Sequence, residues 1–556
     1  MAKRSSEPAA PPPSRGGPYP AGVLDVWGGG QLLAASGLDG PTPYHQALAC
    51  RTPFQGTGLL VKYPDEADLV FSDGPPTRAF LTGDVLDLEH PDGRTRGALL
   101  DACHLLLEGP CKVRSAGAGL KVLARGNRTL VAAAGAFDPG RLDADLDRAI
   151  ADRLRWITTV PRPEVPDGPP RKTLAKCLSV LKTTVYGPEG RLRRRYTTPD
   201  RWPHRGMWLW DSAFHAVGMR HLDPALARDA VEAVLDVQHP DGQVQISYFH
   251  KDERAAATQP PVLAMAAQLV HEADPRAEWV ERIYPKLAAY LQWDMEHRDV
   301  DRNGLLEWQI ESNVRCRCGE SGWDNSPRFD IAKPLDAVDF NAFLARECEA
   351  MAAFARVLGR PDDQARWSAQ RDRLCRLINE RLWDEPLGLY VDAVAGTGEH
   401  RRILTAAGFL PLLCGAASKA QAARLARHLE DPKTFGTALP VATVSPSERA
   451  HYSKDMWRGP VWANINWCIV RGLERSGLGR QARRLRDLTM KAIERYYLEY
   501  GAIFEFFDDE GRVPPPRLLR KRENNPAEWI HQVIHDYGWT AALYVDLAAS
   551  SPAAAT

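Results

Sequence analysis

The stretch PALARDAVEAVLDVQ, residues 224–238, decides how the larger part of this chain folds. Its apolar residues follow the spacing i, i+3, i+4, i+7, i+8: they are Ala227, Ala230, Val231, Val234 and Leu235. This spacing places them on one face of an α-helix. The turn residues HPDGQ come next and end the pattern. The stretch therefore predicts an amphipathic helix that packs one face against a neighbour.

The same spacing recurs further along the chain. It appears in PPVLAMAAQLV, residues 260–270, whose two prolines suit the first turn of a helix. We predict further helices after it, at residues 278–297, 335–358, 362–383, 403–415, 418–430, 460–476, 478–499 and 536–549. They come in pairs joined by short turns, as antiparallel helical hairpins do. No strict repeat of about 33 to 45 residues links them, so a closed arrangement of hairpins is favoured over a solenoid.

The region before these helices has the composition of a β domain. Short β-rich runs such as GTGLLVKYP, RAFLTG, CKVRSA and RTLVAAAG alternate with clusters of Gly, Pro and Asp. These features predict a small antiparallel β domain over residues 22–140. A helix at 142–158 and the linker PRPEVPDGPPRK at 161–172 then connect it, within residues 141–172, to a helical domain at 173–550.

The composition excludes several classes of function. Lys plus Arg equals Asp plus Glu, 71 each, so no basic surface argues for nucleic acid. We find no run of about 18 or more apolar residues that could span a bilayer. Residues 1–21 are rich in Pro, Ser, Gly and Ala and lack the apolar segment of a secretory signal, so we expect a flexible tail.

The cysteines favour a reducing compartment. The chain has ten of them without a regular framework. Cys316 and Cys318 form a CRC pair, but a zinc site needs a second pair or histidines at ligand spacing, and we see none. We therefore expect ordinary reduced thiols and, with the missing signal, a cytoplasmic protein.

Five segments interrupt the helical pattern, and they share a composition rich in Trp, Asp, Gly and Arg. They are residues 201–215, 246–261, 304–330, 452–467 and 501–511. Flat aromatic rings cover the apolar faces of sugar rings, and charged groups bind sugar hydroxyls. A single Trp could equally fill a joint between helices. Five such segments in one chain predict a shared pocket for a carbohydrate.

Within these segments lie motifs that resemble a known family. They are WLWDSAFH, TQPPVLA, ESGWDNSPRF, MWRGPVWANINW, FEFFDDEG and YGWTAALYVDL. In this order, over about residues 200–548, they resemble the motifs of the inverting α-glycosidases of glycoside hydrolase family 63. The trehalases of family 37 and the bacterial mannosylglycerate and glucosylglycerate hydrolases share related motifs. The resemblance implies an (α/α)6 toroid of six helical hairpins with a pocket at one end, preceded by an N-terminal β domain.

The resemblance also implies a pair of catalytic carboxylates. Asp324 of ESGWD would be the general acid and Glu505 of FEFFDD the general base. Hydrolysis of an acetal needs both, and inversion requires about 6.5–9.5 Å between them for a water molecule. We expect burial near Trp323 and neighbouring carboxylates to raise the pKa of Asp324. Glu320 is an alternative acid, but the resemblance makes it a structural residue.

The same motifs imply residues that bind the sugar: Trp210, Asp211, Gln259, Trp323, Asn325, Trp457, Arg458 and Trp462. Asp211 could instead be the N-cap of the helix that SAFHAVG begins. Arg458 could instead be a buried structural arginine. Trp529 and Tyr537 are candidates for the far wall of the pocket. We expect Asp508 and Asp509 to be turn residues and both His204 and His215 to be packed or surface histidines.

One further motif suggests a cation. DVDRNG, residues 299–304, resembles the opening of a calcium loop, with Asp299, Asp301 and Asn303 at alternating positions before a glycine. The full loop pattern requires Glu at its twelfth position, where this chain has Ile310. An Asn-Gly turn is therefore favoured over a calcium site, although a structural ion stays open. The expected chemistry requires no cofactor.

The predicted function is hydrolysis, with inversion, of a terminal α-linked glucosyl or mannosyl residue from a small carbohydrate. A phosphorylase on a similar toroid would not need the base Glu505, and an epimerase would use histidine bases. A non-catalytic sugar-binding protein would not need either carboxylate. Arg315 and Arg317 could reach an acidic leaving group, although a solvated loop is favoured. The sequence leaves open which sugar is cleaved and the oligomeric state.

Overall fold

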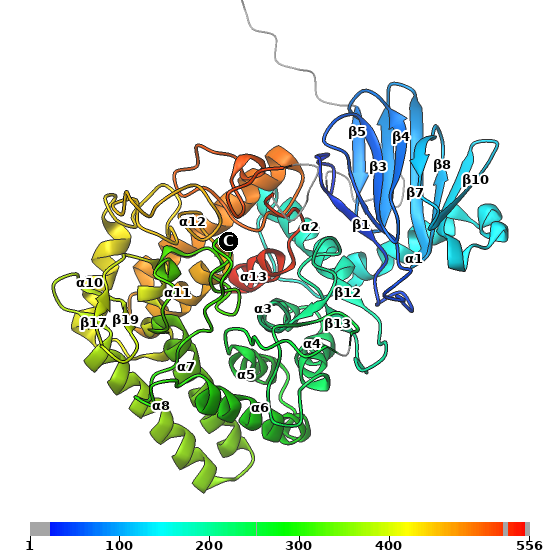
Figure 1. The fold of residues 1–556 in the computed structure, drawn as a ribbon. Helices are drawn as coiled ribbons and strands as arrows, with labels where there is room; N and C mark the ends of the chain where they lie inside the picture. The colour runs from blue at the N-terminus through cyan, green and yellow to red at the C-terminus, as the bar shows by residue number, and fades with distance from the viewer. Residues whose placement is uncertain (1–22, 252, 526–531, 551–556) are drawn as a thin grey trace, which may run out of the picture.

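The computed structural model describes residues 23–251, 253–525 and 532–550, and within them a β-sandwich precedes a ring of helices (Figure 1). The tail predicted at residues 1–21 lies outside the described residues. Within the described ranges, no helix is both long and apolar enough to cross a bilayer.

The first part is an antiparallel β-sandwich, as the sequence predicted. One sheet has the order β1-β2-β3-β4-β9 and the other β10-β11-β8-β7-β6-β5. The strands are β1 Leu32–Ala34, β2 Ala49–Arg51, β3 Thr57–Tyr63, β4 Ala67–Ser72, β5 Arg78–Leu81, β6 Val85–His90, β7 Gly93–Asp101, β8 His104–Glu108, β9 Lys112–Ala116, β10 Leu120–Arg125 and β11 Arg128–Ala133.

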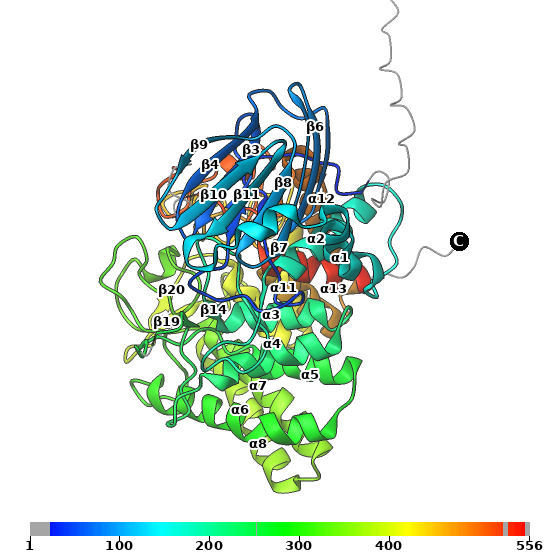
Figure 2. The ribbon, with the colours of Figure 1, turned by 90° about the vertical axis from the view of Figure 1, so that its right-hand side faces the viewer.

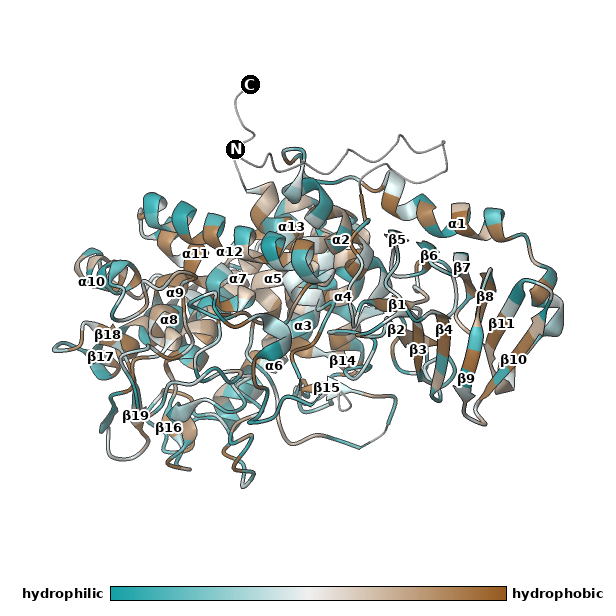
Figure 3. Cartoon of the chain, turned by 90° about the horizontal axis from the view of Figure 1, so that it is seen from above, coloured by the Kyte–Doolittle hydropathy of each residue, from teal (hydrophilic) through white to brown (hydrophobic). Residues whose placement is uncertain are grey.

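The two sheets face each other through their alternating apolar residues. Leu59 and Leu69 of one sheet and Leu86 and Leu105 of the other belong to one buried core. Figure 3 shows the alternation along the strands as changes between brown and teal. Such alternation at period two is what places one face of each strand in a core.

Helix α1, Leu146–Thr159, covers the outer face of the six-stranded sheet. Leu146, Ile150 and Leu154 of this helix pack with Leu106 and Leu130 of the sheet. Its N-cap is Asp145, whose side chain accepts a hydrogen bond from the backbone N–H of Arg148.

The second part is a closed ring of six helical hairpins. The inner helices are α3 Leu209–Met219, α5 Leu263–Ala273, α7 Val338–Val357, α9 Pro411–Cys414, α11 Ala463–Arg475 and α13 Gly538–Ala549. Each contacts the next, and α13 contacts α3, so that the ring closes. The outer helices are α2 Pro169–Thr183, α4 Pro224–Asp236, α6 Ala277–His297, α8 Pro361–Arg381, α10 Lys419–Glu430 and α12 Gly479–Tyr500. In chain order each outer helix precedes its inner partner, so the inner helices all run in the same direction.

Short antiparallel ladders decorate the loops of the ring: β12 Val185–Tyr186 with β13 Tyr196–Thr197, β14 Met207–Trp208 with β15 Ser247–Tyr248, β17 Trp383–Asp384 with β18 Leu389–Tyr390, and β16 Leu335–Asp336 with β19 Asp392–Val394 and β20 His400–Arg401. The loops that carry them lie between the helices that build the ring.

Three sequence expectations about the ring were wrong in detail. Helix α2 begins at Pro169, inside the predicted linker 161–172, because prolines are tolerated in a first helical turn. Helix α3 was read as an irregular segment, since an inner helix that is buried on all sides shows no apolar period. The helix predicted at 403–415 is only α9 after a short 3₁₀ turn, and it ends at Gly415, whose φ is 72°.

The β-sandwich touches the ring beside the motif that carries Glu505. The backbone N–H of Leu32 donates to Asp536 (2.7 Å), and the amide of Gln31 donates to the carbonyl of Gly501 (2.5 Å). Arg51 donates to the carbonyls of His535 and Trp202 (2.8 and 2.6 Å). Figures 1 and 2 show the sandwich seated against this side of the ring.

Candidate active site

A pocket of about 440 Å³ opens where the inner helices begin. Seven of the residues that the family motifs implied for catalysis or sugar binding line it: Trp210, Asp211, Gln259, Asp324, Trp457, Trp462 and Glu505. Each lies in the first turn of an inner helix or in the loop next to it. Because the inner helices all run in the same direction, segments about 300 residues apart in the sequence meet here.

Stacked indole rings form one wall of the pocket. The rings of Trp457 and Trp462 lie parallel with 3.8 Å between their centroids, and Trp539 meets Trp210 edge to face at 5.0 Å. The indole Nε1 atoms of Trp457 and Trp539 are buried and have no hydrogen-bond acceptor among the described residues. Buried donors normally have a partner, so these two suit the hydroxyls of a bound ligand.

The loop that carries Asp324 depends on Gly322. This glycine has a φ of 73°, and a Cβ atom added to it would lie 2.3 Å from the indole ring of Trp210. Both the left-handed backbone and the close ring therefore require glycine. The Ser321 hydroxyl oxygen accepts a hydrogen bond from the backbone N–H of Trp323 (3.0 Å) and fixes the turn before Asp324.

Asp324 is paired with an ammonium group. Its Oδ2 atom lies 2.8 Å from Nζ of Lys521, and both side chains are partly exposed to the pocket. Asp324 raises the pKa of Lys521. Burial, and then Asp324, raise the pKa of the nearby Cys316 thiol. The sequence analysis expected carboxylates beside Asp324, and the structure instead places a cation there.

Glu505 is fully buried in the opposite wall and surrounded by donors. Arg520 donates from Nε to Oε2 (3.1 Å) and from Nη2 to Oε1 (3.3 Å), and the backbone N–H of Ile534 donates to Oε2 (3.2 Å). Donors therefore contact both oxygens of this carboxyl group. Backbone bridges from Phe504 to His535 and from Phe507 to Val461 hold the segment on both sides.

Asp211 lies in the first turn of α3 and faces the same pocket. Trp208 is the N-cap of this helix, so the alternative role of Asp211 as N-cap is wrong. Burial raises the pKa of Asp211 well above its usual value, although the Tyr537 hydroxyl, 3.3 Å from Oδ1, opposes that shift. Gln259 accepts a hydrogen bond from the backbone N–H of Trp210 (3.1 Å), which ties the two sugar-binding candidates together.

Comparison with known proteins identifies the helical domain. The family described as mannosylglycerate hydrolase MGH1-like glycoside hydrolase domain matches residues 203–540, more than half of the chain. The chain belongs to this family.

Two comparisons with named enzymes agree with this assignment. A mannosylglycerate hydrolase of Thermus thermophilus is 28% identical over 386 residues, which are 54% of this chain and 90% of that enzyme. The crystal structure of a GH63 mannosylglycerate hydrolase from Thermus thermophilus in complex with glucose has a TM-score of 0.55 at 25% identity, covering 67% of this chain and 99% of that one.

A more distant structure supports the fold alone. The neutral trehalase Nth1 of Saccharomyces cerevisiae has a TM-score of 0.51 at 18% identity and covers 64% of this chain and 74% of that one. The predictions of a six-hairpin glycosidase fold and of a glycoside hydrolase are therefore confirmed.

Three of the residues predicted to bind the sugar lie behind the pocket. Trp323 is fully buried and packs on Trp457 with 4.8 Å between ring centroids. Oδ1 of Asn325 accepts a hydrogen bond from the backbone N–H of Trp457 (2.9 Å). Arg458 pairs with Asp330 (2.8 and 3.0 Å) outside the pocket, as a structural arginine would, although its side chain is 17% exposed rather than buried. These residues position Trp457 and the loop of Asp324.

Glu320 holds the loop of Asp324 from behind, away from the pocket lining. Its carboxylate accepts hydrogen bonds from the backbone N–H groups of Thr258 (2.9 Å) and Gln309 (2.7 Å) and pairs with Arg298 (2.5 Å). It thereby joins three segments of the ring, as expected for a structural residue.

Two aspartates and two histidines near the motifs were not expected to take part in catalysis. Asp508 and Asp509 lie in the predicted turn, which the N–H of Gly511 closes onto the carbonyl of Asp508 (3.1 Å), and both are also buried and pair with Lys454 (2.5 and 2.6 Å). His215 is packed as expected, and burial lowers its pKa to about 3. His204 is held by Asp200 (2.8 Å) and lines the pocket, as Tyr537 does.

Other predicted residues lie elsewhere. Arg315 is half exposed and pairs with Glu523, and Arg317 binds backbone carbonyls of its own loop, including that of Ser312 (3.1 Å). Neither arginine lines the pocket, so the expectation of a solvated loop fits the structure. Trp529 lies outside the described residues.

Sequence reasoning missed Arg520 and Lys521, the two cations of the pocket. The signal available was the basic run RLLRKR at residues 517–522, between the FEFFDDEG and YGWTAALYVDL motifs. A basic run is usually a solvated face, and only the folded chain turns two of its members onto Asp324 and Glu505.

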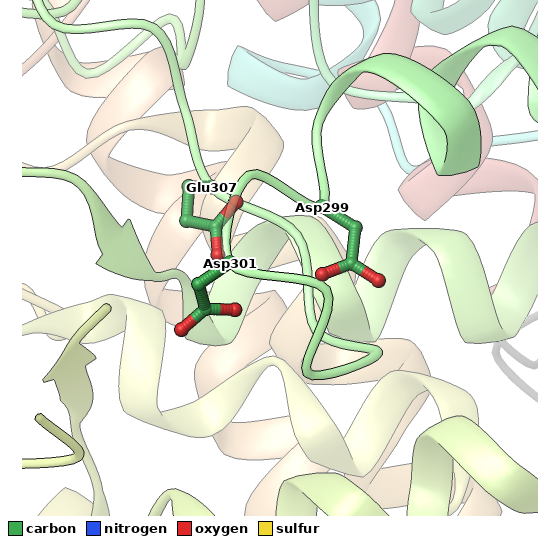
Figure 4. Close-up of side chains that lie close together, drawn as sticks. All are labelled: Asp299, Asp301 and Glu307. Carbon is green, nitrogen blue, oxygen red and sulfur yellow. The ribbon is translucent and has the colours of Figure 1, made fainter. Parts of the chain in front are cut away.

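An acidic cluster lies away from the pocket, after α6. Carboxylate oxygens of Asp299, Asp301 and Glu307 all lie within 4.8 Å of one another (Figure 4). The less favoured calcium alternative counted Asn303 as the third member, but its amide donates to Asp301 (2.9 Å) and Asp336 (3.0 Å), and Glu307 is the third carboxylate of the cluster. Burial raises the pKa of Glu307 to about 8, and one oxygen each of Glu307 and Asp299 is buried with no hydrogen-bond donor among the described residues.

Proposed function

We propose that this protein hydrolyses, with inversion, a terminal α-linked mannosyl or glucosyl residue of a small glycoside whose leaving group is an organic acid such as glycerate. Asp324 is the general acid and Glu505 the general base. The observation that carries the proposal is the burial of Glu505 under three donors in the same pocket as Asp324 and an indole wall.

In the proposed reaction, Asp324 gives its proton to the glycosidic oxygen as the bond to the sugar breaks. Glu505 takes a proton from a water molecule that attacks the opposite face of the sugar. The product has the inverted configuration, and both carboxyl groups return to their starting states by exchanging protons with solvent. Asp211, Gln259 and the free indole N–H groups are placed to bind sugar hydroxyls.

The choice of leaving group rests on the relatives and on the charge of the pocket. The enzymes with the family's name act on mannosylglycerate, and the Thermus thermophilus enzyme of known structure has also been solved with Tris and D-glycerate. Arg520 and Lys521 supply two positive charges to the pocket of this chain, as binding of an anionic substrate requires. A phosphorylase would not need the buried base, and a sugar-binding module would need neither carboxylate.

Proton NMR of the reaction in progress tests this proposal. The panel is α-mannosylglycerate, α-glucosylglycerate, trehalose, kojibiose, nigerose and maltose. We expect the two glycerates to be cleaved fastest and the β-anomer to appear first, before mutarotation. First appearance of the α-anomer would exclude inversion, and no cleavage of any member would exclude the proposed function.

We also propose a structural divalent cation at Asp299, Asp301 and Glu307. Carboxylate oxygens are the ligands that calcium prefers, and the two buried oxygens without donors would gain a partner. The cluster lies apart from the pocket, so the cation would stabilise the loop after α6 rather than take part in the reaction.

A further inference from the structure

A strained hairpin presents Arg520 and Lys521 to the pocket. Arg520 and Glu523 pair through their backbones (2.8 Å from the N–H of Arg520), and Lys521 and Arg522 at the tip have φ of 58° and 69°. Two successive left-handed residues without glycine are uncommon and cost free energy. The hairpin is anchored by the N–H of Arg522 to Asp455 (3.0 Å). The position of the two cations is therefore imposed by the fold.

Arg520 and Lys521 each contact one carboxyl group, and the proposed reaction requires opposite protonation states of these two groups. Arg520 lies against Glu505, and a base must be ionised, so this pairing helps the proposed reaction. Lys521 lies 2.8 Å from Asp324, and a neighbouring ammonium likewise favours the ionised form of a carboxylate. A general acid must instead carry a proton. In the state that the structure shows, the proposed acid is thus paired with a cation.

The geometry points to Lys521 as the residue that makes cleavage depend on a carboxylate in the leaving group. This inference rests on the proposed function. The carboxylate of the leaving group binds the ammonium and replaces Asp324 as its counter-ion. Two carboxylates beside one ammonium repel each other, so Asp324 takes up a proton from solvent and becomes the acid.

The chemistry of a 2-hydroxy acid fits this arrangement. Its carboxylate is attached to the carbon that carries the scissile oxygen, so an acid that reaches this oxygen has the carboxylate beside it. Lysine suits the role because its ammonium is a compact charge on a flexible stem with three N–H donors. A neutral alcohol as leaving group provides no second anion and leaves Asp324 paired.

Other charged and titratable groups lie near Asp324. Arg520 also adds positive charge near Asp324. Its guanidinium, however, donates its hydrogen bonds to Glu505. Cys316 lies beside Asp324 and stays a thiol because burial raises its pKa. Glu311, which lines the pocket, accepts the backbone N–H of Gly319 (2.8 Å). Lys521 is therefore the cation in direct contact with Asp324.

The test compares an acidic substrate with its neutral counterpart. The pairs are α-mannosylglycerate with α-mannosylglycerol and α-glucosylglycerate with α-glucosylglycerol, assayed by kcat/KM. We expect the unmodified enzyme to prefer the acid by about 100-fold, as sites built around a polar group of the substrate do. In Lys521→Met this preference should fall to below about 5-fold.

The decisive readout is the neutral substrate. If Lys521 only binds the leaving group, Lys521→Met slows the acidic substrate and leaves the neutral one unchanged. If Lys521 also holds Asp324 ionised, the variant cleaves the neutral substrate faster. In that case the alkaline limb of its pH profile moves to higher pH, because the acid keeps its proton longer.

Two further variants control the result. Lys521→Arg keeps the charge and should retain most of the preference for the acid. Arg522→Met removes the adjacent, exposed charge of the same hairpin and should leave both rates unchanged. An unchanged preference in Lys521→Met, with unchanged thermal unfolding, overturns the inference and leaves the proposed hydrolysis standing. Failure of the unmodified enzyme to cleave any of the four substrates overturns the proposed function itself.

Discussion

At the scale of single residues, Asp324 and Glu505 both carry a carboxyl group, but the surroundings of the two groups differ. Glu505 is buried with its oxygens contacted by donors of Arg520 and the backbone, whereas Asp324 is partly exposed and paired with the ammonium of Lys521. In the proposed reaction the base must begin each cycle ionised and the acid must begin it protonated. The two carboxyl groups therefore need different environments.

Substitution of either carboxylate tests their proposed roles. Asp324→Asn and Glu505→Gln should each lower kcat by about 10²- to 10⁴-fold, the usual contribution of general acid–base catalysis, with little change in thermal unfolding. Asp167→Asn is the matched control, since it makes the same change at an exposed residue outside the pocket. Near-normal turnover in either active-site variant would show that the assignment is wrong.

At the scale of elements, the loops before the inner helices carry the site, and each is fixed by specific residues. Gly322 lets the Asp324 loop pass under the ring of Trp210, and Glu320 joins that loop to the segments of Thr258 and Gln309. Sequence motifs revealed these loops because their residue types are unusual. The pattern did not reveal that Arg458 faces away from the pocket, since the direction of a side chain depends on packing.

The loop after α6 supplies the prediction at this scale. Adding millimolar calcium after treatment with EDTA should raise the thermal midpoint of the protein. A ligand at 100-fold above its Kd stabilises the folded state by about 2.7 kcal/mol. Glu307→Gln should abolish the response, while Glu296→Gln, an exposed change at the end of α6, should not. A midpoint that is the same with calcium and with EDTA would exclude the cation.

At the scale of the whole molecule, the β-sandwich supports the segment that carries Glu505. Arg51 of β2 donates to the carbonyl of His535, which bridges to Phe504 next to Glu505. Arg51 also lies 3.6 Å from Asp200, and Asp200 holds His204 in the pocket wall. The sandwich is thus connected to the active site through buried polar contacts.

Two arginines of the sandwich allow a matched test of this connection. The side chains of Arg51 and Asp200 are 0% exposed, whereas those of Arg78 and Glu89 are 46% and 44% exposed. Arg51→Met leaves a buried charge without its partner and should destabilise the protein by about 3–5 kcal/mol. Arg78→Met should cost about 1 kcal/mol or less. Calorimetry and kcat are the measurements, and equal effects of the two variants would refute the coupling.

The sequence alone determined the architecture and most of the residues in the site. Helical periodicity identified nearly all the outer helices because each has one buried face, and alternation identified the sandwich. The resemblance of the motifs to family 63 implied Asp324, Glu505 and the indoles of Trp210, Trp457 and Trp462 as site residues, and the structure brings these residues to one pocket. Periodicity did not identify helix α3, because this helix is buried on every side and shows no separate apolar face.

Which charged side chains come into contact in the pocket depends on the tertiary structure. Asp324 and Lys521 are separated by about 200 residues in the chain, yet their charged groups are in contact in the fold. No local sequence pattern predicts that Arg520 and Lys521 of the basic run contact two carboxyl groups. The ring brings them together because its inner helices all begin at one end, and the strained hairpin at Lys521 sets the final distance. The charges that the proposed chemistry depends on were therefore fixed by long-range packing, which a local sequence pattern does not contain.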